Sequence, residues 1–307
     1  MSTLIKNQFT LDDGDCLFRS KDFFMHNRNQ GDLYLEVVKG NSTSGVSCYF
    51  NQNADGTWTS PLKGTYAGPR ISGKVSDSEY YNAVLLFEKE LKSRGATKIE
   101  YVLPPNYLEP SLSTLTSYAL WSSGYHIERM DMNYHIEITK PHLSSHLSTS
   151  KRRTLNKLSN EQFSLELLDH NKLPDVYRLL TLNRSSLGVK LSMELADLRS
   201  LCEQFENRVL LFGLKASDEL MSAAFCLQIN QAAMYVFYWG HHPEADVRDP
   251  ITPLASFIYE YCFHNGIQFL DLGTSTIGSE PNWGLIFFKK SLGAKESMKL
   301  RFSKELN

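Results

Sequence analysis

The sequence predicts a mixed α/β fold in which one small unit of strands and helices occurs twice in tandem. Each half reads strands, a helix ended by glycine, a short strand, a second helix ended by glycine, and a last strand. The first helix-ending glycines, Gly95 and Gly266, and the strands that follow them keep an offset of about 170 residues. Sequence identity between the halves is negligible, so the element order alone indicates a duplication. Coincidence within an ordinary α/β chain is the alternative.

The first half contains a clear helix start. Ser76 and Glu79 form a capping box, in which each side chain satisfies a free N–H group at the helix start, and Gly95 ends this helix. The other expected elements are a hairpin over 31–49, a strand over 99–103, a helix over 111–122 and a strand over 132–138.

The second half repeats the pattern after a helical opening. Three helices are expected in a row, over 148–158, 174–187 and 193–205, the last one capped by Ser192. The expected elements that follow are strands over 208–214, 220–229 and 232–238, a helix over 253–264, a strand over 267–272, a helix over 281–292 and a strand over 299–303.

Composition excludes several classes of protein. The chain has 307 residues, a net charge of −2 and five scattered cysteines. This charge gives no global field for nucleic acid, and no apolar run approaches the roughly 20 residues of a membrane helix. The N-terminus lacks the features of a signal peptide, and no Cys or His spacing indicates a metal. We therefore expect a cytoplasmic, reduced, metal-free protein.

Several short motifs follow one another in the second half, namely Ser150–Arg153, Leu179–Arg184, Leu191–Leu195, Phe269–Gly273, Asn282–Leu285 and Phe288–Ala294. In this order they resemble the FemAB-like branch of the GNAT acyltransferase superfamily. The first half is similar in layout, with a Pro- and Gly-rich loop over 60–69. The resemblance implies two tandem GNAT-like domains, 1–142 and 143–307, each a mixed, mostly antiparallel sheet flanked by helices, with 147–205 as the helical opening of the second.

The same resemblance implies a transferase of cell-envelope or polysaccharide biosynthesis. It implies no tightly bound cofactor, with acyl-CoA or aminoacyl-tRNA as the co-substrate. The acceptor it implies is a nucleotide-linked or lipid-linked amino sugar or a peptide precursor. One departure from ordinary GNAT enzymes concerns the turn that holds the CoA pyrophosphate: residues 241–250 contain two prolines and no glycine pair. Acetyl-CoA binding at that place is therefore doubtful, as in FemAB-type proteins.

Two residues are candidates for the chemistry of acyl transfer to an amine. Asp271 ends a short apolar strand and would orient or deprotonate the amine; the alternative is an Asx-type turn with the following loop. Tyr238 ends another strand, and its hydroxyl would serve as an acid. The alternative for Tyr238 is the aromatic end of a core.

Further residues are candidates for substrate binding. Lys289 would meet a phosphate as a point charge, the role that the resemblance implies, and a solvated helix face is the alternative. Arg152 and Arg153 would bind phosphate or a tRNA backbone; the alternative is a solvated or membrane-facing basic helix. The remaining candidates, each with a purely structural alternative, are Arg184 at a helix end, Trp239 at a strand end, and Asn282 and Trp283 at a helix start.

Three functions remain open at this point. The first is an N-acyltransferase acting on an amino group, with a cleft that joins Tyr238, Asp271, Asn282 and Lys289. The second is a non-catalytic GNAT-like binding protein, favoured by the missing pyrophosphate turn. The third is an aminoacyl-tRNA-dependent aminoacyltransferase, disfavoured because no long helical hairpin is expected.

Overall fold

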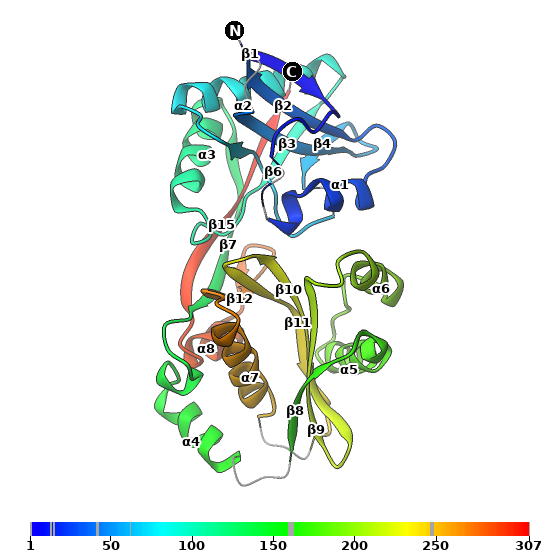
Figure 1. The fold of residues 1–307 in the computed structure, drawn as a ribbon, viewed down its shortest axis with the longest axis vertical. Helices are drawn as coiled ribbons and strands as arrows, with labels where there is room; N and C mark the ends of the chain where they lie inside the picture. The colour runs from blue at the N-terminus through cyan, green and yellow to red at the C-terminus, as the bar shows by residue number, and fades with distance from the viewer. Residues whose placement is uncertain are drawn as a thin grey trace. The chain divides into compact units, whose positions relative to one another are not determined.

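The computed structural model of the chain describes residues 2–12, 14, 16–40, 43–61, 63–158, 163–245 and 249–306 (Figure 1). They form two compact units. Unit 1 is Met1–Asn133 with Gly278–Glu280 and Ser297–Asn307, and unit 2 is Tyr134–Ile277 with Pro281–Glu296. Each unit is a mixed, mostly antiparallel sheet with helices beside it, as the sequence predicted.

Unit 1 is built on strands in the order β1-β2-β3-β4-β6-β15-β7, with β5 on β3. The strands are β1 (Ser2–Lys6), β2 (Leu33–Lys39), β3 (Gly45–Gln52), β4 (Thr57–Ser60), β5 (Arg70–Ser72), β6 (Lys98–Val102), β7 (His126–Glu137) and β15 (Lys295–Glu305). The helices are α1 (Lys21–Asn27), α2 (Asp77–Ser93) and α3 (Pro110–Ser122).

The capping box of α2 is confirmed. The Ser76 side chain accepts a hydrogen bond from the Glu79 N–H, and the Glu79 carboxylate accepts one from the Ser76 N–H. The apolar face of this helix is fully buried against the sheet, where it meets Phe50 and Tyr101. Burial of such a face, rather than helix propensity, supplies most of the stability of a helix of this length.

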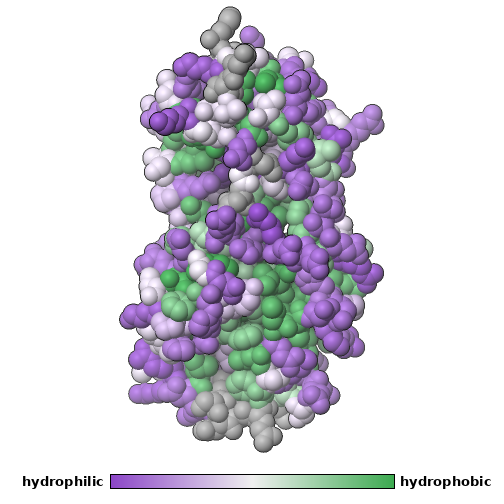
Figure 2. Space-filling model, viewed as in Figure 1, coloured by the Kyte–Doolittle hydropathy of each residue, from purple (hydrophilic) through white to green (hydrophobic). Residues whose placement is uncertain are grey.

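Unit 2 has its strands in the order β7-β12-β11-β10-β9-β8. Helices α5 and α6 lie on one side of this sheet and α7 lies on the other (Figure 1). Figure 2 shows hydrophobic residues gathered beside α7 over the strands of this unit. The strands are β8 (Ser164–Leu168), β9 (Val209–Ala216), β10 (Glu219–Asn230), β11 (Ala233–His241), β12 (Phe269–Thr274), β13 (Thr276–Ile277) and β14 (Glu280–Pro281); the helices are α4 (Thr149–Leu158), α5 (Leu173–Ser186), α6 (Leu195–Gln204), α7 (Ile251–His264) and α8 (Trp283–Ser291).

Two expectations for the helical opening are wrong. A strand, β8, stands between α4 and α5, and it pairs antiparallel with β9 over residues 164–168. The next helix, α6, is capped by Glu194 rather than by Ser192, because Glu194 and Asp197 form their own capping box. The Ser192 hydroxyl is instead hydrogen-bonded to Tyr238, 2.5 Å away.

The boundary between the compact units also differs from the domain boundary that was expected between residues 142 and 143. The last strand, β15, pairs antiparallel with β6 from Arg301 opposite Val102 to Glu305 opposite Lys98, so residues 297–307 count with unit 1. The strand β7 likewise runs from unit 1 into unit 2, which begins at Tyr134. A sequence pattern defines a strand but not its pairing partner, and this is why the predicted boundary differs.

Candidate functional site

The candidate site begins where two parallel strands of unit 2 separate. The registered pairs between β11 and β12 run from Ala233 opposite Phe269 to Tyr235 opposite Asp271. Beyond them β11 continues to His241 and β12 to Thr274. On its other side β11 shifts register against β10, with Phe225 opposite Tyr238 and Cys226 opposite Val236. The extra residue, Phe237, makes a β-bulge, a feature that commonly re-aims side chains beside a site.

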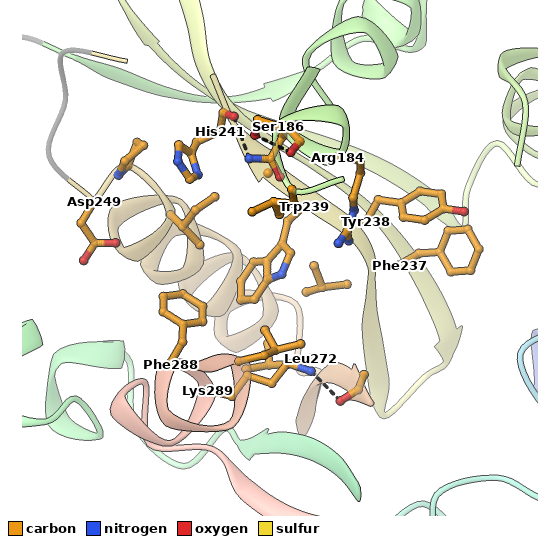
Figure 3. Close-up of a pocket in the computed structure, with 18 of the residues that line it drawn as sticks. Arg184, Ser186, Phe237, Tyr238, Trp239, His241, Asp249, Leu272, Phe288 and Lys289 are labelled. Carbon is orange, nitrogen blue, oxygen red and sulfur yellow. Dashed lines mark hydrogen bonds between the residues drawn. The ribbon is translucent and has the colours of Figure 1, made fainter. Parts of the chain in front are cut away.

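A cavity of about 1010 Å³ lies along this opening (Figure 3). Residues of α5, β11, β12 and α8 line it, and its wall is rich in aromatic rings: Tyr235, Phe237, Tyr238, Trp239 and Phe288. The volume is at the upper end of the range for small-molecule sites, and an apolar lining with a few polar groups is typical of them.

Lys289 is the most deeply buried charged group of this cavity, with 1% of its surface exposed. Its Nζ donates hydrogen bonds of 2.8 Å to the carbonyl oxygens of Gly273 and Thr274, which lie in β12 beyond its last pair with β11. Burial lowers the pKa of Lys289 to about 7; the nearby charge of Arg184 acts in the same direction and that of Asp271 opposes it. An ammonium group has three hydrogens, so one remains for a substrate oxygen.

Arg184 reaches into the cavity from α5, whereas Lys289 reaches into it from α8 (Figure 3). The guanidinium has no hydrogen-bond or ion-pair partner among the residues that the structure describes. An arginine guanidinium offers a planar fork of five donors, a geometry that suits a carboxylate or a phosphate. The two cations give this part of an otherwise aromatic cavity a positive character.

The walls of the cavity are held by hydrogen bonds and an ion pair. The Asn183 amide donates to the His241 carbonyl oxygen, 3.0 Å away, which ties α5 to the end of β11. Lys151 of α4 forms an ion pair of 2.6 Å with Asp249 and lies 4.7 Å from the centre of the Phe288 ring. Trp239 meets the same ring edge-on at 5.7 Å.

The structure brings together four of the predicted site residues and separates the others. Tyr238, Trp239, Arg184 and Lys289 line one cavity. Asp271 is buried and does not line the cavity, and its Oδ1 accepts a hydrogen bond of 2.7 Å from the Gly273 N–H, the Asx-type turn that was the alternative. The expected cleft therefore contains Tyr238 and Lys289, while its other two members do not line it.

The remaining candidates have other surroundings. Asn282 caps α8 by accepting from the Leu285 N–H, 3.0 Å away. Trp283 is 71% exposed, and Arg153 is exposed as well. Arg152 donates to the carbonyl oxygens of Ser144 and Leu147. A role of these residues in substrate binding stays a prediction.

Sequence reasoning missed the roles of two residues of the cavity wall, Asn183 and Phe288, and of Lys151, which contacts the wall residues Asp249 and Phe288. Asn183 and Phe288 are the sequence neighbours of the predicted Arg184 and Lys289, and Lys151 belongs to the basic motif 150–153. The motifs therefore contained these residues, but the sequence did not predict their contacts. Over the described ranges, no three His, Cys, Asp or Glu side chains gather as metal ligands. No helix within those ranges is long and apolar enough to cross a membrane.

Comparison with solved structures identifies the fold. The crystal structure of FemX matches with a TM-score of 0.73 and 15% identity, covering 100% of this chain and 98% of that one. The chain has the tandem GNAT fold of FemX. A tandem GNAT protein from the clavulanic acid biosynthesis pathway matches with a TM-score of 0.58 and 12% identity over 99% of this chain and 98% of that one.

A third structure with the FemX-like fold is the C-terminal domain of a putative lysylphosphatidylglycerol synthetase from Agrobacterium fabrum. It matches with a TM-score of 0.62 and 10% identity over 95% of this chain and 88% of that one. No model of a protein family matches the chain. No curated protein sequence matches it either. At these identities the likeness to FemX establishes the fold and the predicted GNAT architecture, and the chemistry has to be argued from the site.

Proposed function

We propose that the protein is an N-acyltransferase that moves an acyl or aminoacyl group to an amine of a cell-envelope or nucleotide-sugar precursor. The observation that carries this proposal is the pair of cations, Lys289 and Arg184, in an aromatic cavity where β11 and β12 separate. Acyl transfer to an amine passes through a tetrahedral intermediate whose oxygen becomes negative. A buried cation beside the reacting carbonyl stabilises that charge more than water does.

Lys289 supplies the cation for the developing oxyanion. Its two bonds to carbonyl oxygens fix the Nζ position, so no reorganisation is needed when the charge forms. Because the pKa is about 7, the ammonium form that donates this hydrogen bond is favoured below neutral pH. The activity should therefore fall as the pH rises through about 7.

Arg184 supplies the binding site for an anionic part of the substrate, a phosphate or a carboxylate. Hydrogen bonds to charged groups contribute about 1.5–3 kcal/mol each, so Arg184→Ala should raise KM by roughly 10- to 100-fold. Arg178→Ala is a matched control, because Arg178 lies on the same helix with 75% of its side chain exposed. Tyr238 is the candidate acid: its hydroxyl gives a proton to the leaving group as the acyl bond breaks, and the phenolate takes the proton that the amine loses when the new N–C bond forms. Asp271 holds the Gly273 turn, whose carbonyl oxygen accepts from Lys289.

The deciding experiment is a transfer assay with labelled donors. Acetyl-CoA and aminoacyl-tRNA are offered with nucleotide-linked amino sugars and peptide precursors as acceptors. The proposal requires transfer with at least one pair and its loss in Lys289→Ala with the fold retained. Equal activity of Lys289→Ala and the unaltered protein would refute the role of Lys289.

A non-catalytic binding protein is the second candidate. Residues 241–250 lack the glycine pair with which GNAT enzymes are expected to hold a CoA pyrophosphate. Thermal shift separates the two candidates, since an enzyme is stabilised by a donor and by an acceptor, whereas a binder is stabilised by one class of ligand alone. An aminoacyl-tRNA donor, expected from the FemAB resemblance, is an outcome of the same assay.

A further inference from the structure

The outer face of α8 carries an unusually exposed apolar stripe. Trp283 and Phe287 stand one turn apart and are 71% and 75% exposed, and Ile277 of β13 is 69% exposed. These are the three largest exposed fractions among the hydrophobic side chains described. Lys290 continues the stripe at the next turn. Large apolar side chains gathered on a surface mark an interaction site more often than scattered ones do.

The neighbouring helix α4 adds positive charge. The Ser148 N–H, just before α4, donates to the Ser291 carbonyl oxygen at the end of α8, 2.9 Å away. Neither helix contains an acidic residue. Arg153 and Lys157 are exposed and have no ion-pair partner within the described ranges. Arg152 is bonded to carbonyl oxygens, which leave its charge uncompensated.

Two exposed carboxylates flank α8 in the sequence, Glu280 before it and Glu296 after it. Lys290 lies 3.5 Å from Glu296, and both side chains are more than half exposed, so water and salt screen the pair. The ion pair between Lys151 and Asp249 is more buried, and its Asp249 lines the cavity. The exposed charged residues of α4 are thus basic and the exposed residues of α8 are largely aromatic, and the two helices meet at Ser148 and Ser291. We name these residues together the α4–α8 surface: Arg152, Arg153, Lys157, Ile277, Trp283, Phe287 and Lys290.

We propose that the α4–α8 surface binds to an anionic lipid membrane. Aromatic rings settle at the headgroup level of a bilayer, and a basic helix next to them is attracted by anionic lipids. Each cation near such a surface strengthens binding about fivefold, because the negative potential of the anionic leaflet attracts it. Three exposed apolar side chains and four cations supply both parts of this recognition.

Two other occupants fit the surface less well. Single-stranded RNA is recognised by base stacking along a positively charged groove, whereas Ile277 offers no ring for stacking and the aromatic residues project from a helix with over two thirds of their area exposed. A second copy of the chain in a two-fold dimer would bring the same cations against one another. The membrane is the occupant whose charge complements the surface.

Membrane binding goes beyond the proposed transferase activity and does not depend on it. Phe288 and Lys289 lie on the cavity side of α8, while Phe287 lies on the outer side. Helix α8 thus stands between the cavity and the proposed membrane face, so membrane binding and transfer can be measured separately.

The test uses the full chain and vesicles of phosphatidylcholine with about one third phosphatidylglycerol, against vesicles of phosphatidylcholine alone. Co-sedimentation measures binding. The double variant Trp283→Ser/Phe287→Ser should reduce binding to anionic vesicles at least tenfold. The matched control is Tyr118→Ser/Trp121→Ser on α3, an aromatic pair that is 63% and 66% exposed on a helix without charged residues.

A charge-reversal pair tests the electrostatic part. Arg153→Glu/Lys157→Glu should also reduce binding at least tenfold, and added salt should weaken binding of the unaltered protein. Lys89→Glu/Lys92→Glu on α2 is the control, because both lysines are exposed and lie outside the α4–α8 surface. All four variants change exposed side chains, and thermal melting confirms that each is folded.

Three outcomes would overturn the proposal. One is equal binding to the two kinds of vesicle, and another is equal binding of the α4–α8 variants and their controls. The third is another occupant of the surface. In that case the unaltered protein would not bind vesicles, and the α4–α8 variants would lose tRNA binding or a concentration-dependent dimer that the unaltered protein forms. The single variants Phe287→Ser and Lys157→Glu change residues that are not candidates for substrate binding and do not line the cavity. If they lose vesicle binding and retain transfer to a soluble acceptor, the membrane surface is supported and the proposed activity is intact.

Discussion

The Nζ atom of Lys289 lies 2.8 Å from the carbonyl oxygen of Gly273, which joins α8 to the part of β12 beyond its last pair with β11. Gly273 has a φ of 76°, a left-handed conformation that favours glycine, and its N–H donates to Asp271. The same residue thus accepts a hydrogen bond from the Lys289 ammonium group with its carbonyl oxygen and donates one to the Asp271 carboxylate with its N–H group. The chemistry of the cavity and the stability of unit 2 are coupled at this residue.

The first prediction concerns stability against pH. The pKa of Lys289 is about 7 in the folded protein, against 10.5 in an unfolded chain. Between these values the unfolded state binds more protons, so the free energy of unfolding rises with pH from about 7 towards 10.5. Lys289→Met removes this titration. Across this window the urea midpoint of the unaltered protein should rise relative to that of Lys289→Met, and a constant difference between the two would contradict the burial of the ammonium group.

The second prediction separates the two roles of Asp271. Asp271→Asn keeps an Oδ1 acceptor for the Gly273 N–H, so its stability should stay close to that of the unaltered protein, whereas Asp271→Ala should lose about 1–2 kcal/mol. Because the Asp271 charge raises the pKa of Lys289, the asparagine variant should also move the pH–activity profile to lower pH. Complete inactivity of Asp271→Asn at every pH would identify the carboxylate as the proton acceptor instead.

The third prediction concerns the link between α5 and β11. A Cβ atom at Gly240 would lie 2.7 Å from Oδ1 and 2.9 Å from Cγ of Asn183, so Gly240→Ala must displace this amide and break its bond to His241. We expect a loss of about 1–3 kcal/mol in urea unfolding.

Gly284→Ala provides the control for this substitution. Its Cβ would meet only Asn282 Oδ1 at 3.7 Å, and alanine suits a helix better than glycine. This variant should be neutral or slightly more stable. Equal losses in the two variants would mean that the Asn183 contact is unimportant.

The fourth prediction concerns unit 1. Glu36 is fully buried and accepts hydrogen bonds from Thr10, Leu11 and the Tyr34 hydroxyl, the last at 2.6 Å. Glu36→Ala leaves these donors without an acceptor and should cost about 3 kcal/mol or more in unfolding free energy. Glu36→Gln, which retains one oxygen, should lose less. An alanine variant as stable as the unaltered protein would show that water replaces the carboxylate.

Much of the fold was readable from the sequence because its signals are local. The capping box at Ser76 and the helix-ending glycines Gly95 and Gly266 are decided within one helical turn, and the structure confirms them. The strand β8 was missed because its five residues alternate weakly and gain their place only by pairing with β9. The pairing of β15 with β6 is equally non-local.

The candidate site was readable in part for the same reason. Lys289 and Arg184 were found through short motifs, but no pattern shows that one amine is 1% exposed or that one guanidinium lacks a partner within the described ranges. The role of Asn282 as a helix cap was an alternative that only the distance to Leu285 could decide. Burial and hydrogen-bond partners come from tertiary packing, and a motif states neither.

The last prediction separates two roles of the Tyr238 hydroxyl, which lies 2.5 Å from Ser192. If this hydroxyl protonates the leaving group, Tyr238→Phe should lower kcat/KM about 100-fold or more, while Ser192→Ala should change it only a few-fold. If the hydrogen bond serves only to hold the segment before α6 against β11, both variants remove the same contact and should lose activity equally. We expect the unequal result, because Tyr238 lines the cavity beside Arg184 and Ser192 does not. Steady-state kinetics of the two variants with one donor–acceptor pair decides between these roles.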